Sequence, residues 1–401
     1  MARDELTESG FGRSVLETVT AVLGNAPVSA PQGSDHSAIV ELLMTHRLEG
    51  LARVRGLGGA EPIGEAVDPA YRRYQIGTGL AVDASARVCR ALSDAGIASL
   101  RFKGAALVAS GLYDDPGARP MDDADILVPE ERAREAADVL VKEGFEPWGQ
   151  WNDSHASWLD SFTLSDPGAP AAFPVTIDLH WRTAYGSLRF GVVGASSLLW
   201  DGADLNDHLP AAEPHLVVVA EHVLKHLRVK THLLAYADLV RLVGAVTDWD
   251  AVVLAARPRF LGPAVGVLLD VLRSDLGAVV PLEVIADLTS RGARVGRTRE
   301  RLRPVMLISR GEDGPGRLAG LQLRTALAPS TGALASDLLA SAFPDPEWLR
   351  ARYGVGATWR LRARYVSACL RWAFRWGPSP TSPNQQQPEN RGTSTDRGVS
   401  E

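Results

Sequence analysis

Residues 101–128 read RFKGAALVASGLYDDPGARPMDDADILV, and this stretch decides the fold that the sequence predicts. A strand-like segment at 98–103 enters a helix-like segment at 104–112 through a glycine, and a second strand follows at 124–128. Strand and helix therefore alternate here, a pattern typical of a sheet with helices packed on it.

Helical periodicity surrounds this segment on both sides. Helices are expected over 70–95 and 129–144, then three short strands in FEPWG, SFTLS and FPVTIDLHWR, and then further helices over 213–272 and 281–339. The last 25 residues are rich in Pro, Ser, Gln and Gly and are expected to be disordered. We predict an α+β protein with a helical lead-in (1–69), a small mixed sheet with flanking helices (70–205), a mainly helical second domain (206–376) and a tail (377–401).

Composition excludes several classes of protein. The net charge of -6 gives no general attraction to nucleic acid or to anionic lipid, so nucleic acid is an unlikely partner. Two cysteines, Cys89 and Cys369, favour a reducing compartment over a disulfide scaffold. The N-terminus lacks the features of a secretory signal, and no apolar run is long enough to span a bilayer. We expect a cytoplasmic enzyme.

Three aspartates carry the chemistry. Asp123 and Asp125 are two residues apart at the start of a strand, so their side chains project from the same face. Two neighbouring carboxylates repel unless a cation lies between them, and Mg²⁺ is a hard cation that binds carboxylate oxygens and phosphates. Asp178 lies in the apolar strand VTIDLHWR. If that strand pairs with 124–128, three acids converge on a site suited to metal-assisted phosphoryl transfer.

The chain resembles the polymerase-β-like nucleotidyltransferase superfamily, and within it the bacterial group called uncharacterised nucleotidyltransferases. The resemblance extends from about residue 38 to about residue 375. It rests on a few short segments and single residues: Lys103-Gly104 before a helix, RPMDDADILV at 119–128, IDLHW at 177–181, His222, His226, Asp238 and FPDPEWLRARYG at 343–354.

The resemblance implies a nucleotidyltransferase-type palm in which Asp123, Asp125 and Asp178 bind Mg²⁺ or Mn²⁺. The substrates would be a nucleoside triphosphate and a hydroxyl or phosphate acceptor on a small molecule, a sugar or a modified peptide. The usual Gly-Ser that opens the phosphate-binding helix is Gly104-Ala105 here. This departure leaves a second interpretation open, a non-catalytic or redirected relative that serves as a binding module in natural-product or cell-surface tailoring.

Further residues are candidates for binding nucleotide or acceptor. Lys103, Gly104, Ala105, Arg119 and His180 are expected to contact phosphate. Lys225 and His226 are expected either to line the acceptor side of the cleft or to lie on a solvated helix face.

Each candidate also has an ordinary structural interpretation. Asp122 could replace either acid of the pair through a shift of one residue, and Asp178 could cap a loop or pair with Arg182. Lys103 could be a solvated strand end, and His180 a packed histidine. Arg119 could form a salt bridge to Asp114 or Asp115.

Two other features need a structural test. His222 and His226 are four residues apart on one helix face and could bind zinc, although no third ligand is evident. Residues 348–377 contain seven arginines, seven aromatic residues and no acid. Such a segment could bind a membrane surface or nucleic acid, or it could be an amphipathic helix whose aromatic residues pack on the protein body.

Overall fold

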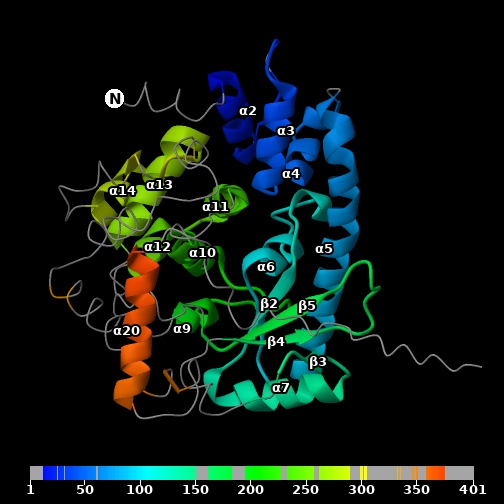
Figure 1. The fold of residues 1–401 in the computed structure, drawn as a ribbon, viewed down its shortest axis with the longest axis vertical. Coiled ribbons are helices and arrows are strands. Elements are labelled where there is room, and N and C mark those ends of the chain that lie inside the picture. The colour runs from blue at the N-terminus through cyan, green and yellow to red at the C-terminus, as the bar shows by residue number, and fades with distance from the viewer. Residues whose placement is uncertain are drawn as a thin grey trace, which may run out of the picture. The chain divides into compact units, whose positions relative to one another are not determined.

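The computed structural model describes residues 12–24, 26–30, 32–59, 62–149, 151, 161–182, 195–226, 233–256, 262–289 and 358–374, with a few single positions between 299 and 350. The chain divides into two compact units, Met1–Trp348 and Leu349–Glu401. Figure 1 shows the elements of both units.

The first unit begins with short helices and one long one. These elements are α2 (Arg13–Leu23), α3 (His36–Thr45), α4 (Glu49–Val54), the 3-10 turn η1 (Leu57–Gly59) and α5 (Ile63–Asp94). Helix α5 starts at Ile63, earlier than the sequence predicted, and it contains Pro69. Its 32 residues run along the flank of the sheet in Figure 1.

The sheet has five strands in the order β1-β2-β5-β4-β3. The strands are β1 (Leu100–Arg101), β2 (Asp123–Leu127), β3 (Glu146–Pro147), β4 (Ser161–Ser165) and β5 (Thr176–His180). Strands β2 and β5 pair in parallel, whereas the other neighbours are antiparallel. Between the strands come α6 (Lys103–Ala109), the 3-10 turns η2 (Pro116–Ala118) and η3 (Glu130–Arg132), and α7 (Ala133–Lys142). The expected α+β class with a small mixed sheet is confirmed.

The two faces of the sheet differ in chemistry. One face presents Ala124, Ile126, Ile177 and Leu179, which pack with buried residues of α5 and α7 in one apolar core. The other face carries the acids of β2 and β5, because side chains alternate along a strand. The sheet is therefore anchored by its apolar face and leaves its polar face for chemistry.

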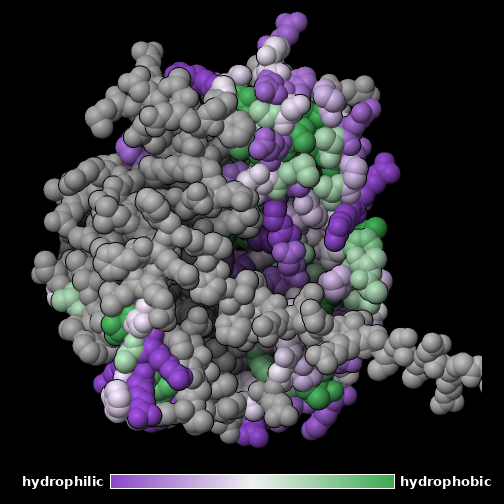
Figure 2. Space-filling view, viewed as in Figure 1, coloured by the Kyte–Doolittle hydropathy of each residue, from purple (hydrophilic) through white to green (hydrophobic). Residues whose placement is uncertain are grey.

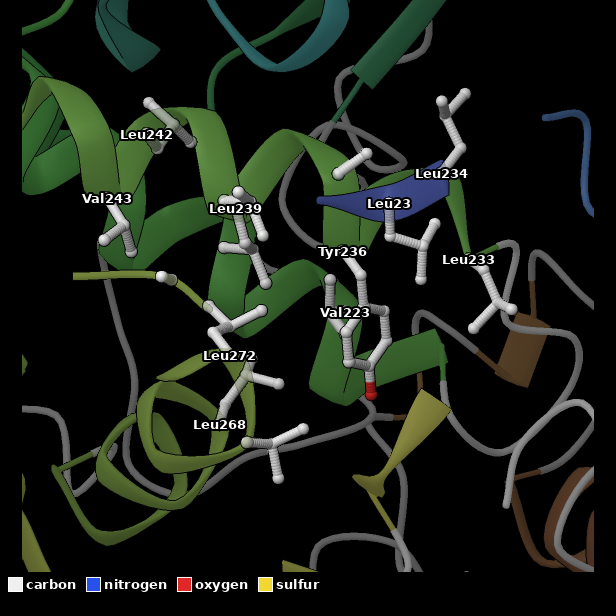
Figure 3. Packing of buried hydrophobic residues seen from close by; sticks show 14 of the residues in the cluster. Leu23, Val223, Leu233, Leu234, Tyr236, Leu239, Leu242, Val243, Leu268 and Leu272 are labelled. Carbon is white, nitrogen blue, oxygen red and sulfur yellow. The ribbon is translucent and has the colours of Figure 1, made fainter. Parts of the chain in front are cut away.

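A second apolar core holds the helical part of this unit. It joins α2–α4 to α10 (Ala212–His226), α11 (Leu234–Ala245), α12 (Trp249–Ala256), α13 (Gly262–Leu276) and α14 (Leu282–Thr289). Figure 3 shows Leu23 of α2 packed with Val223 of α10 and Tyr236 of α11. The Tyr236 hydroxyl donates to the carbonyl oxygen of Leu302 at 2.8 Å, so this buried phenol is satisfied. The domain boundaries expected from the sequence stay a prediction.

Some local expectations need correction. Strand β1 is shorter than 98–103, because Lys103 has a positive φ of 49° and already begins α6. Pro129 does not start a helix. It is an extended residue (ψ 137°) before η3, and α7 begins only at Ala133. The three short strands are confirmed as β3, β4 and β5, and the strand over 124–128 as β2.

The remaining described elements are α9 (Ala195–Trp200) in the first unit and α20 (Thr358–Phe374) in the second. Helix α20 covers residues 358–374 of the arginine-rich segment. Its Trp359 is 67% exposed, and Leu361 is buried. No helix among the described residues has the length and apolar character that crossing a bilayer requires.

Candidate functional site

The parallel pairing of β2 and β5 aligns two acids. Asp125 lies directly opposite Asp178 in the register, and Asp123 lies opposite Thr176. Paired residues of neighbouring strands point to the same face, so Asp123, Asp125 and Asp178 share the polar face of the sheet. The strand pairing on which the sequence argument depended is therefore confirmed.

Among the described residues, one group has the ligand spacing of a metal site. The ligand atoms of Asp125, Asp178 and His180 all lie within 4.8 Å of one another. His180 Nε2 is 2.9 Å from Oδ1 of Asp125, and the imidazole packs edge-on against Phe102 with ring centroids 5.0 Å apart. His180 is buried and lies within hydrogen-bonding distance of Asp125. Asp123 is not part of this group.

Lys103 neutralises Asp125. Its Nζ lies 2.6 Å from Oδ1 of Asp125, and both side chains are largely buried. Burial alone would raise the pKa of Asp125, but the charge of Lys103 and the contact with His180 hold that pKa well below its ordinary value. Burial alone would lower the pKa of Lys103, yet the charge of Asp125 outweighs it and the pKa is raised. Lys103 is thus a charged partner of the acids and not a solvated strand end.

The pKa of Asp123 shifts in the opposite direction to that of Asp125. Its side chain is still reached by solvent, but partial withdrawal from water and repulsion by Asp125 and Asp178 raise the pKa of Asp123 to about 6. Asp122 does not take its place: it is 76% exposed and pairs with Arg47, with Nη2 donating to Oδ1 at 2.9 Å. The aspartates on the polar face therefore carry more negative charge than Lys103 alone neutralises. A cation site requires such an excess.

Asp178 is fixed by β4. The Thr163 hydroxyl donates to Oδ1 of Asp178 at 2.6 Å, and Thr163 is its partner in the antiparallel register. Arg182 pairs with Glu130 and not with Asp178. One carboxylate oxygen of Asp178 lies within 4.8 Å of the ligand atoms of Asp125 and His180.

Arg119 pairs with an acid from the helical part. Nη2 donates to Oδ2 of Asp238 at 2.9 Å and Nε to Oδ1 at 3.3 Å, while the Tyr113 hydroxyl donates to the same Oδ1 at 2.7 Å. The expected alternative of a bridge to Asp114 or Asp115 is wrong, because Asp115 accepts from the Tyr71 hydroxyl and from the N–H of Gly117. Only 16% of the Arg119 side chain is exposed.

Gly104 and Ala105 lie in the first turn of α6, next to this arginine. A Cβ atom built at Gly104 would lie 2.4 Å from Nη1 of Arg119 and 2.8 Å from Sδ of Met121. At these distances the ends of the Arg119 and Met121 side chains would have to move to admit a Cβ atom. Glycine lets the guanidinium pack directly against its backbone.

Sequence reasoning missed His215, a buried residue of α10 whose Nε2 accepts the N–H of Lys103 at 2.9 Å. It also gave no contact partner to Asp238 of α11. Neither residue has a local signal, because each meets its partner across more than a hundred residues of chain. The side chains of Lys225 and His226 lie outside the described residues. The zinc hypothesis for His222 and His226 therefore also falls outside them.

In Figure 2, hydrophilic residues gather in a hollow on the face where Figure 1 places α6 and β2. A small mixed sheet with two carboxylates side by side on its polar face is compatible with a nucleotidyltransferase domain. The family model described as "Uncharacterised nucleotidyltransferase" matches residues 32–274, more than half of the chain, and the chain belongs to this family. Comparisons with curated proteins and with solved structures gave no match.

Proposed function

We propose that this chain transfers a nucleotidyl group from a nucleoside triphosphate to a hydroxyl or phosphate acceptor, with Mg²⁺ or Mn²⁺ bound at the polar face of the sheet. The observation that carries the proposal is the pairing of Asp125 with Asp178 on adjacent parallel strands, with His180 beside them. Membership of the nucleotidyltransferase family supports the class of reaction.

The side chains present fit a divalent cation. Ligands in neighbouring positions of an octahedron lie about 3 Å apart when each is about 2.1 Å from the metal. His180 Nε2 and Asp125 Oδ1 are 2.9 Å apart, and all three ligand atoms lie within 4.8 Å. Oδ1 of Asp125 lies 2.6 Å from the ammonium of Lys103, so a metal ion at this carboxylate would share it with Lys103. Asp125 and Asp178 would hold the ion, with His180 or Asp123 completing the set.

A divalent ion bound there would stabilise the negative charge that develops on the phosphoryl group during transfer. The side chains of the chain have their own tasks. Asp178, held by the Thr163 hydroxyl, keeps one oxygen directed toward the site. Lys103 carries the positive charge closest to the acids, so its Nζ is placed to donate to a phosphate oxygen of the donor. Arg119 has N–H donors beyond those used by Asp238, which suits a second contact to phosphate.

A second function has one specific observation in its favour. Ala105 stands where the superfamily has serine, so the hydroxyl contact to phosphate is missing. A relative that binds nucleotide or another anion without transferring it would keep the acids and lose that contact. The two functions differ in turnover and not in metal binding.

The test measures binding and transfer separately. Titration calorimetry with Mn²⁺ should give a binding isotherm for the wild type and none for Asp125→Asn, which keeps the shape of the side chain and removes its charge. Asp122→Asn is the matched control, because that neighbouring acid is exposed and paired with Arg47.

Transfer is then assayed with labelled nucleoside triphosphates and a panel of hydroxyl and phosphate acceptors. Metal-dependent label transfer that Asp125→Asn abolishes supports the transferase. Nucleotide binding without transfer to any acceptor supports the binding module. A wild type that binds neither Mn²⁺ nor nucleotide rules out both functions.

A further inference from the structure

The turn that presents Lys103 to the acids has an unfavourable backbone conformation. Lys103 has a φ of 49°, in the left-handed region that side chains other than glycine rarely adopt. The preceding residue, Phe102, continues the sheet, because its N–H donates to the carbonyl oxygen of Asp125 at 3.1 Å. The chain therefore leaves the sheet and enters α6 within one residue, and neighbouring groups must stabilise that conformation.

His215 is the first of these groups. It lies on α10 with 3% of its surface exposed, and its Nε2 is 2.9 Å from the N–H of Lys103. Only a neutral imidazole can accept at Nε2. Burial lowers the pKa of His215 to about 4, against a smaller opposing effect of Asp238 and Asp125, so the ring is neutral at physiological pH.

Arg119 and Asp238 form the second group that stabilises this turn. The guanidinium of Arg119 lies against Gly104, where a Cβ atom would come within 2.4 Å of Nη1. Asp238 holds that guanidinium through two hydrogen bonds and is itself held by the Tyr113 hydroxyl. Helices α10 and α11 thus each supply one residue that acts on the Lys103–Gly104 turn, one directly and one through Arg119.

We propose that His215 and the Arg119–Asp238 pair are positioning residues that hold the Lys103–Gly104 turn, so that the ammonium of Lys103 stays on Asp125. The site on the sheet is then completed by the helical part of the same unit. This inference deepens the proposed function, because Lys103 is there the group that meets the phosphate. The positioning of Lys103 by these residues does not depend on whether the chain transfers nucleotides.

The test uses amine labelling of the full chain, read by mass spectrometry. Lys103 should react slowly with an amine-specific acylating reagent because its Nζ is bonded to Asp125, whereas the exposed Lys142 serves as an internal reference. In His215→Leu, which leaves the Lys103 N–H without an acceptor, the Lys103 rate relative to Lys142 should rise about two- to tenfold. His215→Gln offers an amide oxygen to that N–H and should return the rate toward that of the wild type.

Amide hydrogen exchange gives a second reading. The Lys103 N–H should exchange faster in His215→Leu by a similar factor and be protected again in His215→Gln. His222→Leu, the same substitution seven residues along α10, should change neither reading. If His215→Leu does not fold, Arg119→Lys replaces it, since it keeps the charge and removes the guanidinium that covers Gly104.

The outcomes separate this inference from the proposed function. Unchanged labelling and unchanged exchange at Lys103 in a folded His215→Leu or Arg119→Lys protein would overturn the positioning role. Faster labelling that glutamine does not reverse would also contradict it, because a general loosening of the core would then explain the change. A wild type without affinity for nucleotide would refute the proposed function and leave the labelling result valid.

Discussion

Protonation of His215 should make the folded protein sensitive to mild acid. The pKa of His215 is lowered to about 4 by burial, whereas a histidine in the unfolded chain titrates near 6.5. Because the folded state disfavours the charged ring, the stability is complete above pH 6.5 and is lost as the pH falls from 6.5 toward 4. With these two values, His215 alone should lower the free energy of unfolding by about 2 kcal/mol between pH 7 and pH 5.

The perturbation that isolates this effect is His215→Gln, which cannot titrate and can still accept the N–H of Lys103. Urea unfolding followed by tryptophan fluorescence at pH 7 and pH 5 gives the two free energies for each protein. All other titrating groups are common to both proteins. The change in the free energy of unfolding between pH 7 and pH 5 should therefore differ between wild type and variant only by the contribution of His215. Equal pH dependence in wild type and variant would refute the reasoning, since it would mean that the ring is hydrated or charged in the folded state.

Three further substitutions, the first with a matched control, test the packing, each by urea unfolding at pH 7. Gly104→Ala should destabilise the protein by about 1–3 kcal/mol, because its Cβ atom meets Arg119. Gly79→Ala is the control: it lies in α5 with nothing within 4 Å of the new atom, and it should stabilise the protein by up to about 1 kcal/mol. An equal effect at both glycines would contradict the close packing over Gly104. Asp238→Ala should cost about 3–5 kcal/mol, because it leaves a buried arginine without a counter-charge, and a loss below about 1 kcal/mol would show that the pair is solvated. Leu239→Ala should cost about 2–5 kcal/mol through the cavity left in the helical core, and a near-neutral result would place this residue outside a packed core.

Local sequence was enough to predict the elements of the sheet. Apolar residues follow Asp125 directly, and alternation along β5 places Asp178 and His180 on one face. The two-residue spacing of Asp123 and Asp125 requires both to project from the same side of β2. These features depend on neighbours within a few residues, so they can be predicted without knowing the fold.

Local sequence predicted the helix ends less well. The long helix was expected to begin at residue 70, but α5 extends back to Ile63 and contains Pro69. Lys103 was assigned to a strand, but it begins α6 with a positive φ, which is not expected of lysine. The N–H of this residue donates to His215, and this contact spans 112 residues of chain.

The tertiary structure alone decided which groups meet. The sequence could place Asp178 near Asp125 only if β5 pairs with β2. In the structure the two strands pair in a parallel register that makes Asp125 and Asp178 direct partners, and their apolar face packs against α5 and α7. Arg119 had two acids close by in sequence, yet it pairs with Asp238, 119 residues away. Burial explains the difference: a charge removed from water needs a partner at the depth where packing places it, and sequence distance does not report depth. The sequence by itself therefore determined the acids and the strands that carry them, whereas the folded structure determined which partners Lys103 and Arg119 meet and that His215 lies beside Lys103.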